Sequence, residues 1–117
     1  MGKLADKAVY NHKNYYSCSA AVLCAFHEVL VLSETDAQRK AAPFAGGRAG
    51  KCGAVMAAEY VLKQVYGSNA DIKISEFERR FISKEKGSVM CIELQGKVPG
   101  SCRACVTDAA LILEDML

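Results

Sequence analysis

The chain has 117 residues and a mass of 12.6 kDa, which is the size of a single domain. Hydrophobic residues make up 51% of it, so a core can form without crosslinks, and six cysteines are too few for a typical disulfide scaffold. The 15 basic and 13 acidic residues leave a net charge of +2, which excludes the large basic excess typical of nucleic-acid-binding proteins.

Residues 1–14 are expected to form an N-terminal extension to a helical domain over residues 15–117. The extension lacks the apolar stretch of a secretory signal. The most apolar run of the chain, residues 20–26, is much shorter than the ~20 residues that span a membrane. We therefore expect a cytoplasmic protein with no membrane and no nucleic-acid partner. Thiols stay reduced there, so several cysteines in one small domain indicate metal or redox chemistry more than structural disulfides.

Apolar residues recur at helical spacing from residue 16 onward, whereas the strict alternation of strands never persists for more than a few residues. We therefore predict an all-α fold, a compact single-domain bundle of about five helices. The first, over residues 16–32, is apolar nearly all round, which is typical of the buried centre of a bundle. The second, over residues 36–42, begins at a capping box of Thr35 and Gln38.

A glycine-rich stretch over residues 45–51 leads to a third helix over residues 52–66, with Gly67 as its stop. The stretch follows a predicted helix rather than a strand and lacks the residue pattern of a phosphate-binding loop. We therefore expect no nucleotide here. The glycines would instead allow the backbone to approach a cysteine site closely.

Three further segments have helical patterns. A helix over residues 76–86 is expected to start at a capping box of Ser75 and Glu78, with Phe77 and Phe81 facing inward. A short helix over residues 89–95 and a final helix over residues 102–116 follow. Each of these two has a serine at its predicted cap.

Four of the six cysteines fall at predicted helix N-termini, namely Cys18, Cys52, Cys91 and Cys102. Backbone N–H groups and the positive end of the helix dipole favour a thiolate over a thiol at such positions. A thiolate is the form that binds metal, attacks disulfides and is oxidised. The alternative is that these residues are small hydrophobic side chains whose positions are coincidental.

The other two cysteines are expected to differ from these four. Cys24 follows Cys18 by six residues, about 120° round the helix, so it is expected to be an inert core residue. Cys105 follows Cys102 as C-x-x-C; we expect Cys102 to be the inward member and Cys105 to lie at the flank. His27 is expected to be a core or boundary histidine rather than a ligand.

Two common cysteine sites are disfavoured. The segment from Cys102 to Val106 lacks the histidine of a c-type haem attachment site, so no haem is expected. A zinc finger needs two close pairs of ligands, which the chain lacks.

The order of several short segments resembles the C_GCAxxG_C_C family of redox-active proteins. The resemblance runs from about residue 15 to residue 117 and is carried by residues 16–23, 44–47, 52–55, 76–81, 87–94, Cys102 and 108–114. Alanine stands at position 57, where the family usually has glycine. The resemblance implies that the family's four named cysteines are Cys18, Cys52, Cys91 and Cys102. A similar domain occurs in split-Soret cytochromes, where its cysteines are thought to hold an iron–sulfur centre, and their haem-binding tail is not expected here.

Three hypotheses follow for the function. The first is a metal site, best an iron–sulfur cluster, on Cys18, Cys52, Cys91 and Cys102 for electron transfer or redox sensing. The second is a metal-free thiol–disulfide protein in which Cys102 and Cys105 are the catalytic pair, or in which a pair drawn from Cys18, Cys52 and Cys91 cycles. The third is a non-catalytic interaction domain. The expected partner is a redox protein of undefined class, and a homodimer is compatible with the sequence.

Overall fold

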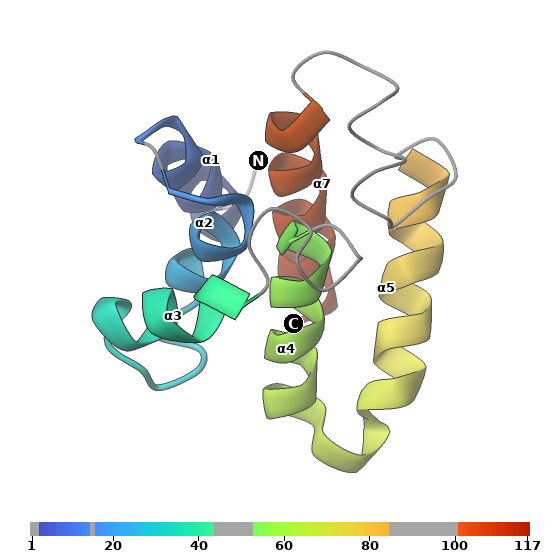
Figure 1. Cartoon of the computed structure of the whole chain (residues 1–117). Helices are drawn as coiled ribbons and strands as arrows, with labels where there is room; N and C mark the ends of the chain where they lie inside the picture. Colours follow the sequence, from blue (N-terminus) through green and yellow to red (C-terminus); the bar gives the residue numbers. More distant parts are fainter. Residues whose placement is uncertain (1–2, 15, 44–52, 85–100) are drawn as a thin grey trace.

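A computed structural model describes residues 3–14, 16–43, 53–84 and 101–117 of the chain, with residues 84 and 101–104 described by their backbone alone (Figure 1). The helices are α1 (Lys3–Lys13), α2 (Cys18–Ala25), α3 (Glu34–Ala41), α4 (Gly53–Tyr66), α5 (Ala70–Lys84) and α7 (Ser101–Met116). A 3-10 helix, η2 (Gly67–Asn69), joins α4 to α5. The described residues contain no strand, which confirms the predicted all-α fold.

Helix α2 lies at the centre of the bundle. All eight of its residues are buried, and α1, α3, α4 and α7 pack against it. Its sequence has no polar face, since only Ser19 interrupts the apolar residues, and Ser19 donates a hydrogen bond to the Ala41 carbonyl at 2.9 Å. A helix that is apolar on all sides is typically found in the interior of a protein. The prediction of a central first helix is confirmed.

The predicted end of this helix at residue 32 is wrong, because α2 ends at Ala25 and turns follow. They close in a Schellman motif: the Leu32 amide donates to the His27 carbonyl and the Val31 amide to the Glu28 carbonyl. Val31 has a φ of 56°, where glycine is usual. The apolar run continues through this turn and no glycine marks it, so the spacing alone extends the helix too far.

Other helix boundaries were predicted with mixed success. The third predicted helix matches α4 closely, and Gly67, with a φ of 56°, ends it as expected. The predicted capping box at Thr35 is wrong, since Ser33 caps α3 by accepting from the Asp36 amide. Ser75 is not a cap either, because α5 already begins at Ala70. The predicted short helix over residues 89–95 lies outside the described residues.

Helix α1 was not predicted, although it packs against both α2 and α7. Its buried residues are Ala5, Ala8 and Asn11, which are small or polar and give a weak apolar pattern. Asn11 donates a hydrogen bond through its side chain to the Ala21 carbonyl in α2, at 3.2 Å. Residues 3–13 of the N-terminal segment therefore form a helix that packs on the bundle.

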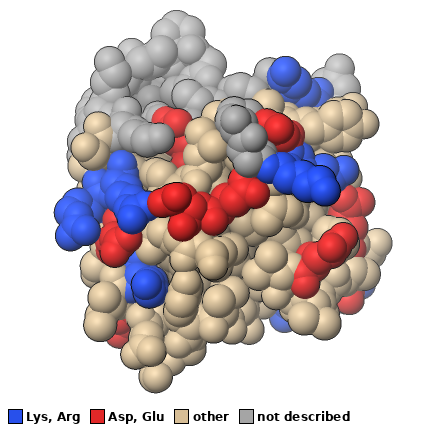
Figure 2. All heavy atoms as spheres, turned by 180° about the vertical axis from the view of Figure 1, so that it is seen from behind, with Lys and Arg blue, Asp and Glu red and all other residues tan. Residues whose placement is uncertain are grey.

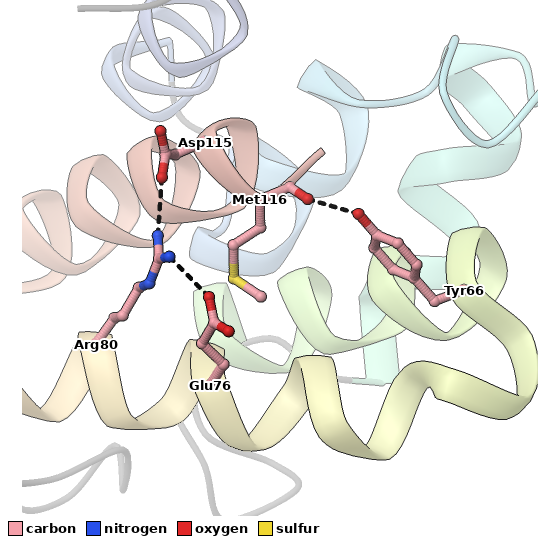
Figure 3. Close-up of polar contacts among 5 residues, drawn as sticks. All are labelled: Tyr66, Glu76, Arg80, Asp115 and Met116. Atoms are coloured by element: carbon pink, nitrogen blue, oxygen red, sulfur yellow. Dashed lines mark hydrogen bonds and ion pairs between the residues drawn. The ribbon is translucent and has the colours of Figure 1, made fainter.

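Helices α4, α5 and α7 pack on one another. Phe77 and Phe81 face inward as predicted, fully buried, with ring centroids 6.1 Å apart. At the surface, Arg80 bridges Glu76 and Asp115 at 2.7 and 2.8 Å (Figure 3). The Tyr66 hydroxyl donates to the Met116 carbonyl at 2.6 Å and so ties α4 to the end of α7.

Acidic side chains of the described residues gather across the middle of the face seen from behind, with basic side chains on both sides (Figure 2). This mixed pattern fits the small net charge of the chain. In the part of the chain that the structure describes, no helix combines the length and the hydropathy needed to cross a membrane.

Replacing Val31 with glycine is expected to stabilise the fold by about 1 kcal/mol. A β-branched residue is strained at a φ of 56°, and the Val31 side chain is 89% exposed, so its loss removes little packing. Urea unfolding of Val31→Gly measures the effect, with Val29→Gly as the control because Val29 has no positive φ. A Val31→Gly variant less stable than the parent would contradict the strain argument.

Candidate functional site

Cys18 is the first residue of α2 and is 8% exposed. The local sequence places it there because Ser17 caps the helix: its hydroxyl accepts from the Ala20 amide at 3.2 Å. The first turn contains no acidic residue. Cys18 therefore lies at the positive end of a helix dipole, which favours a thiolate, whereas its burial among apolar side chains opposes ionisation.

Cys24 lies near the other end of α2 and is fully buried. Its thiol donates to the Glu34 carbonyl at 3.6 Å. Burial raises the pKa of this thiol to about 11, and the negative charge of Glu34 adds to the rise, while Lys7 opposes it. Cys24 therefore stays protonated at neutral pH, in agreement with its expected role as an inert core residue.

The pKa of Tyr16, like that of Cys24, is raised in part by the Glu34 carboxylate. Burial raises the pKa of the Tyr16 hydroxyl, and the charge of Glu34 and the Cys24 thiol raise it further. The start of α3 thus places one carboxylate near two groups that ionise only at high pH.

Cys105 lies in the first half of α7 and is 1% exposed, so the expectation that it lies at the flank is wrong. Ala109 and Ile112 follow it at helical spacing and are also buried, which places Cys105 on the core face. Cys102 is the second residue of α7, confirming its position at a helix start. Its side chain lies outside the description, so its expected inward orientation remains a prediction.

The helices that begin at or next to Cys18, Cys52 and Cys102 pack on one another in pairs. Contacts join α2 to α4, α4 to α7 and α2 to α7. Helix α2 begins at Cys18, α4 begins directly after Cys52, and α7 begins directly before Cys102. Cys18, Cys24 and Cys105 belong to one continuous hydrophobic core, and all three are thiols.

Cys52 and Cys91 lie outside the described residues. Within the described ranges, no three histidine, cysteine or acidic side chains form a group that would hold a metal ion. His27 is half-buried and its Nδ1 lies 2.9 Å from the Leu32 carbonyl. Because a carbonyl can only accept, Nδ1 is the donor, and His27 is the boundary histidine that was expected.

Glu59 is a buried charged residue that the sequence reasoning missed. It is 6% exposed in the middle of α4, between the core residues Val55 and Leu62. Its spacing from these two places it on the same face of the helix, and that spacing was the available signal. Burying a carboxylate is costly unless it is paired, and Glu59 does interact with another group.

Cys24 is expected to make stability fall at high pH. Its folded pKa is about 11, against an ordinary value of 9.0, so the unfolded chain loses this proton first. The contribution of the protonated Cys24 thiol to the free energy of unfolding is fully present below pH 9 and is lost as the pH rises toward 11. Chemical unfolding of the parent and of Cys24→Ala between these values measures it, and the loss should be smaller in Glu34→Gln. Equal pH slopes for the parent and Cys24→Ala would contradict the account.

One comparison with known proteins identifies a family. The family model described as "Putative redox-active protein (C_GCAxxG_C_C)" matches residues 16–116, a stretch that includes α2 to α7 and all six cysteines. Neither the comparison with curated proteins nor that with solved structures finds a match. The resemblance predicted from the sequence is confirmed: this chain belongs to the C_GCAxxG_C_C family of putative redox-active proteins.

Proposed function

We propose that Cys18, Cys52, Cys91 and Cys102 together bind an iron–sulfur cluster that serves in electron transfer or redox sensing. One observation carries the proposal: the helices that begin at or beside Cys18, Cys52 and Cys102 pack on one another in pairs. Three of the four sulfurs thus belong to helix starts within one small bundle. Membership of a redox-active family supports the same assignment.

The chemistry of the donor set fits this group. Thiolates are the preferred ligands of iron–sulfur clusters, and four is the usual number. Cys18 is held among apolar side chains at a helix N-terminus, where N–H groups stabilise negative sulfur. When bound, such a cluster supplies one-electron redox chemistry.

Neighbouring residues would keep the ligand set selective. Ser17 fixes the first turn of α2 and so holds the Cys18 thiol in place. Cys24 lies on the same helix, but its raised pKa keeps it protonated and unsuited to compete for iron. The alanine at position 57 is fully buried, and α4 still packs against α2 and α7, so this departure from the family pattern does not prevent close packing.

Protein purified without oxygen from iron-replete cells is expected to contain iron and acid-labile sulfide. Replacing Cys18 with serine should reduce both to background, because a ligand is lost. Cys24→Ser is the matched control, since it makes the same change in the same helix, and it should retain both. The paired iron and sulfide analyses test the whole proposal.

Two results would overturn the proposal. One is a colourless protein without iron or sulfide under these conditions. The other is equal loss of iron in Cys18→Ser and Cys24→Ser, which would indicate damage to α2 rather than removal of a ligand. Circular dichroism of both variants checks that the helices remain.

A second candidate is a metal-free thiol–disulfide protein, favoured by the position of Cys102 and Cys105 three residues apart in α7. Their oxidation would form one S–S bond and release two electrons and two protons to a disulfide acceptor. Thiol titration against defined glutathione mixtures should then show a two-electron couple between about −120 and −300 mV that Cys105→Ser abolishes. Absence of such a couple would exclude this function.

A further inference from the structure

Helix α1 is attached to the bundle mainly by small and polar residues. Its fully buried side chains are Ala5 and Ala8, and Asn11 is 1% exposed. Alanine methyl groups remove little apolar surface from water, although Leu4 also packs, partly buried, against the core and α1 covers part of α2. The buried apolar side chains that α1 itself contributes are therefore small, and hydrogen bonds to the bundle add to its attachment.

Two polar contacts join α1 to the helices behind it. At its start, both carboxylate oxygens of Glu114 in α7 accept hydrogen bonds, from the Leu4 amide at 3.0 Å and from the Ala5 amide at 3.2 Å. Amides in the first turn have no acceptor within their own helix. A carboxylate at this position also interacts favourably with the positive end of the helix dipole. Near the other end of α1, Asn11 donates to the Ala21 carbonyl in α2.

A hollow of about 620 Å³ lies between α1 and the end of α2. From α1 it is lined by Lys3, Leu4, Asp6, Lys7 and Tyr10, and from the facing segment by Cys24, Ala25, His27 and Glu28. Cys24 is fully buried even though it borders this hollow. Helix α1 therefore forms one wall of the hollow that Cys24 borders.

We propose that α1 is a releasable cover: when it leaves Glu114 and Ala21, the Cys24 thiol is exposed while the other helices stay folded. The family match begins at residue 16, after α1 has ended. Release of a weakly held terminal helix is a local opening that needs less free energy than global unfolding. The proposal is independent of the iron–sulfur assignment, because Cys24 is not one of the four assigned ligands.

Alkylation of the full chain by iodoacetamide reports this opening. The Cys24 sulfur forms a bond to carbon, iodide leaves and the thiol proton passes to solvent, and fragmentation of the peptide by mass spectrometry separates Cys24 from Cys18. Glu114→Gln removes the charge and one of the two acceptor oxygens, and it should speed alkylation of Cys24 by about tenfold. Asp115→Asn is the matched control, because Asp115 contacts Arg80 of α5. It should leave the rate at that of the parent.

Amide hydrogen exchange distinguishes release of α1 from global unfolding. In the parent chain, amides of α1 should exchange through an opening with a smaller urea dependence than those of α2, α4 and α7. Asn11→Ala tests the second contact and replaces Glu114→Gln if that variant does not fold. The proposal is wrong if the amides of α1 exchange only when the whole bundle unfolds, or if Asp115→Asn has the same effect as Glu114→Gln. It is also wrong if neither Glu114→Gln nor Asn11→Ala speeds alkylation of Cys24.

Discussion

The complete burial of α2 is the constraint on which the rest of the structure depends. All eight of its residues are buried, and α1, α3, α4 and α7 pack around it. The few polar groups on this helix are satisfied locally: Ser19 donates to Ala41, and Ser17 caps the first turn. The helices around α2 hold it in one position, with Cys18 at its start and Cys24 near its end.

The two thiols of α2 differ because their surroundings differ. Both lie in the buried core, but Cys18 lies where helix amides favour negative charge, whereas burial, with the nearby Glu34 carboxylate, raises the pKa of Cys24. The two thiols of this one helix therefore differ in how readily they ionise. The chain belongs to a family described as redox-active, and the proposed ligand set uses Cys18 and leaves Cys24 out.

Much of the fold was predictable because apolar spacing and glycine signals agree along most of the chain. They locate α4, its stop at Gly67 and the inward pair Phe77 and Phe81. The spacing failed for α1, whose buried face is built from alanine and asparagine, and at Val31, where a valine occupies a glycine position. Helix placement brought Cys18 and Cys102 to helix starts as predicted, but it misplaced Cys105, because the core face of α7 is wider than one stripe.

The central claim is that four cysteines from helix starts share one redox site around the buried α2. A crystal structure of the protein purified and kept without oxygen tests it most directly. The account predicts that the sulfurs of Cys18, Cys52, Cys91 and Cys102 surround a single iron–sulfur cluster, with Cys24 outside it and still reduced. Sulfurs directed to separate parts of the molecule, with no iron between them, would contradict it.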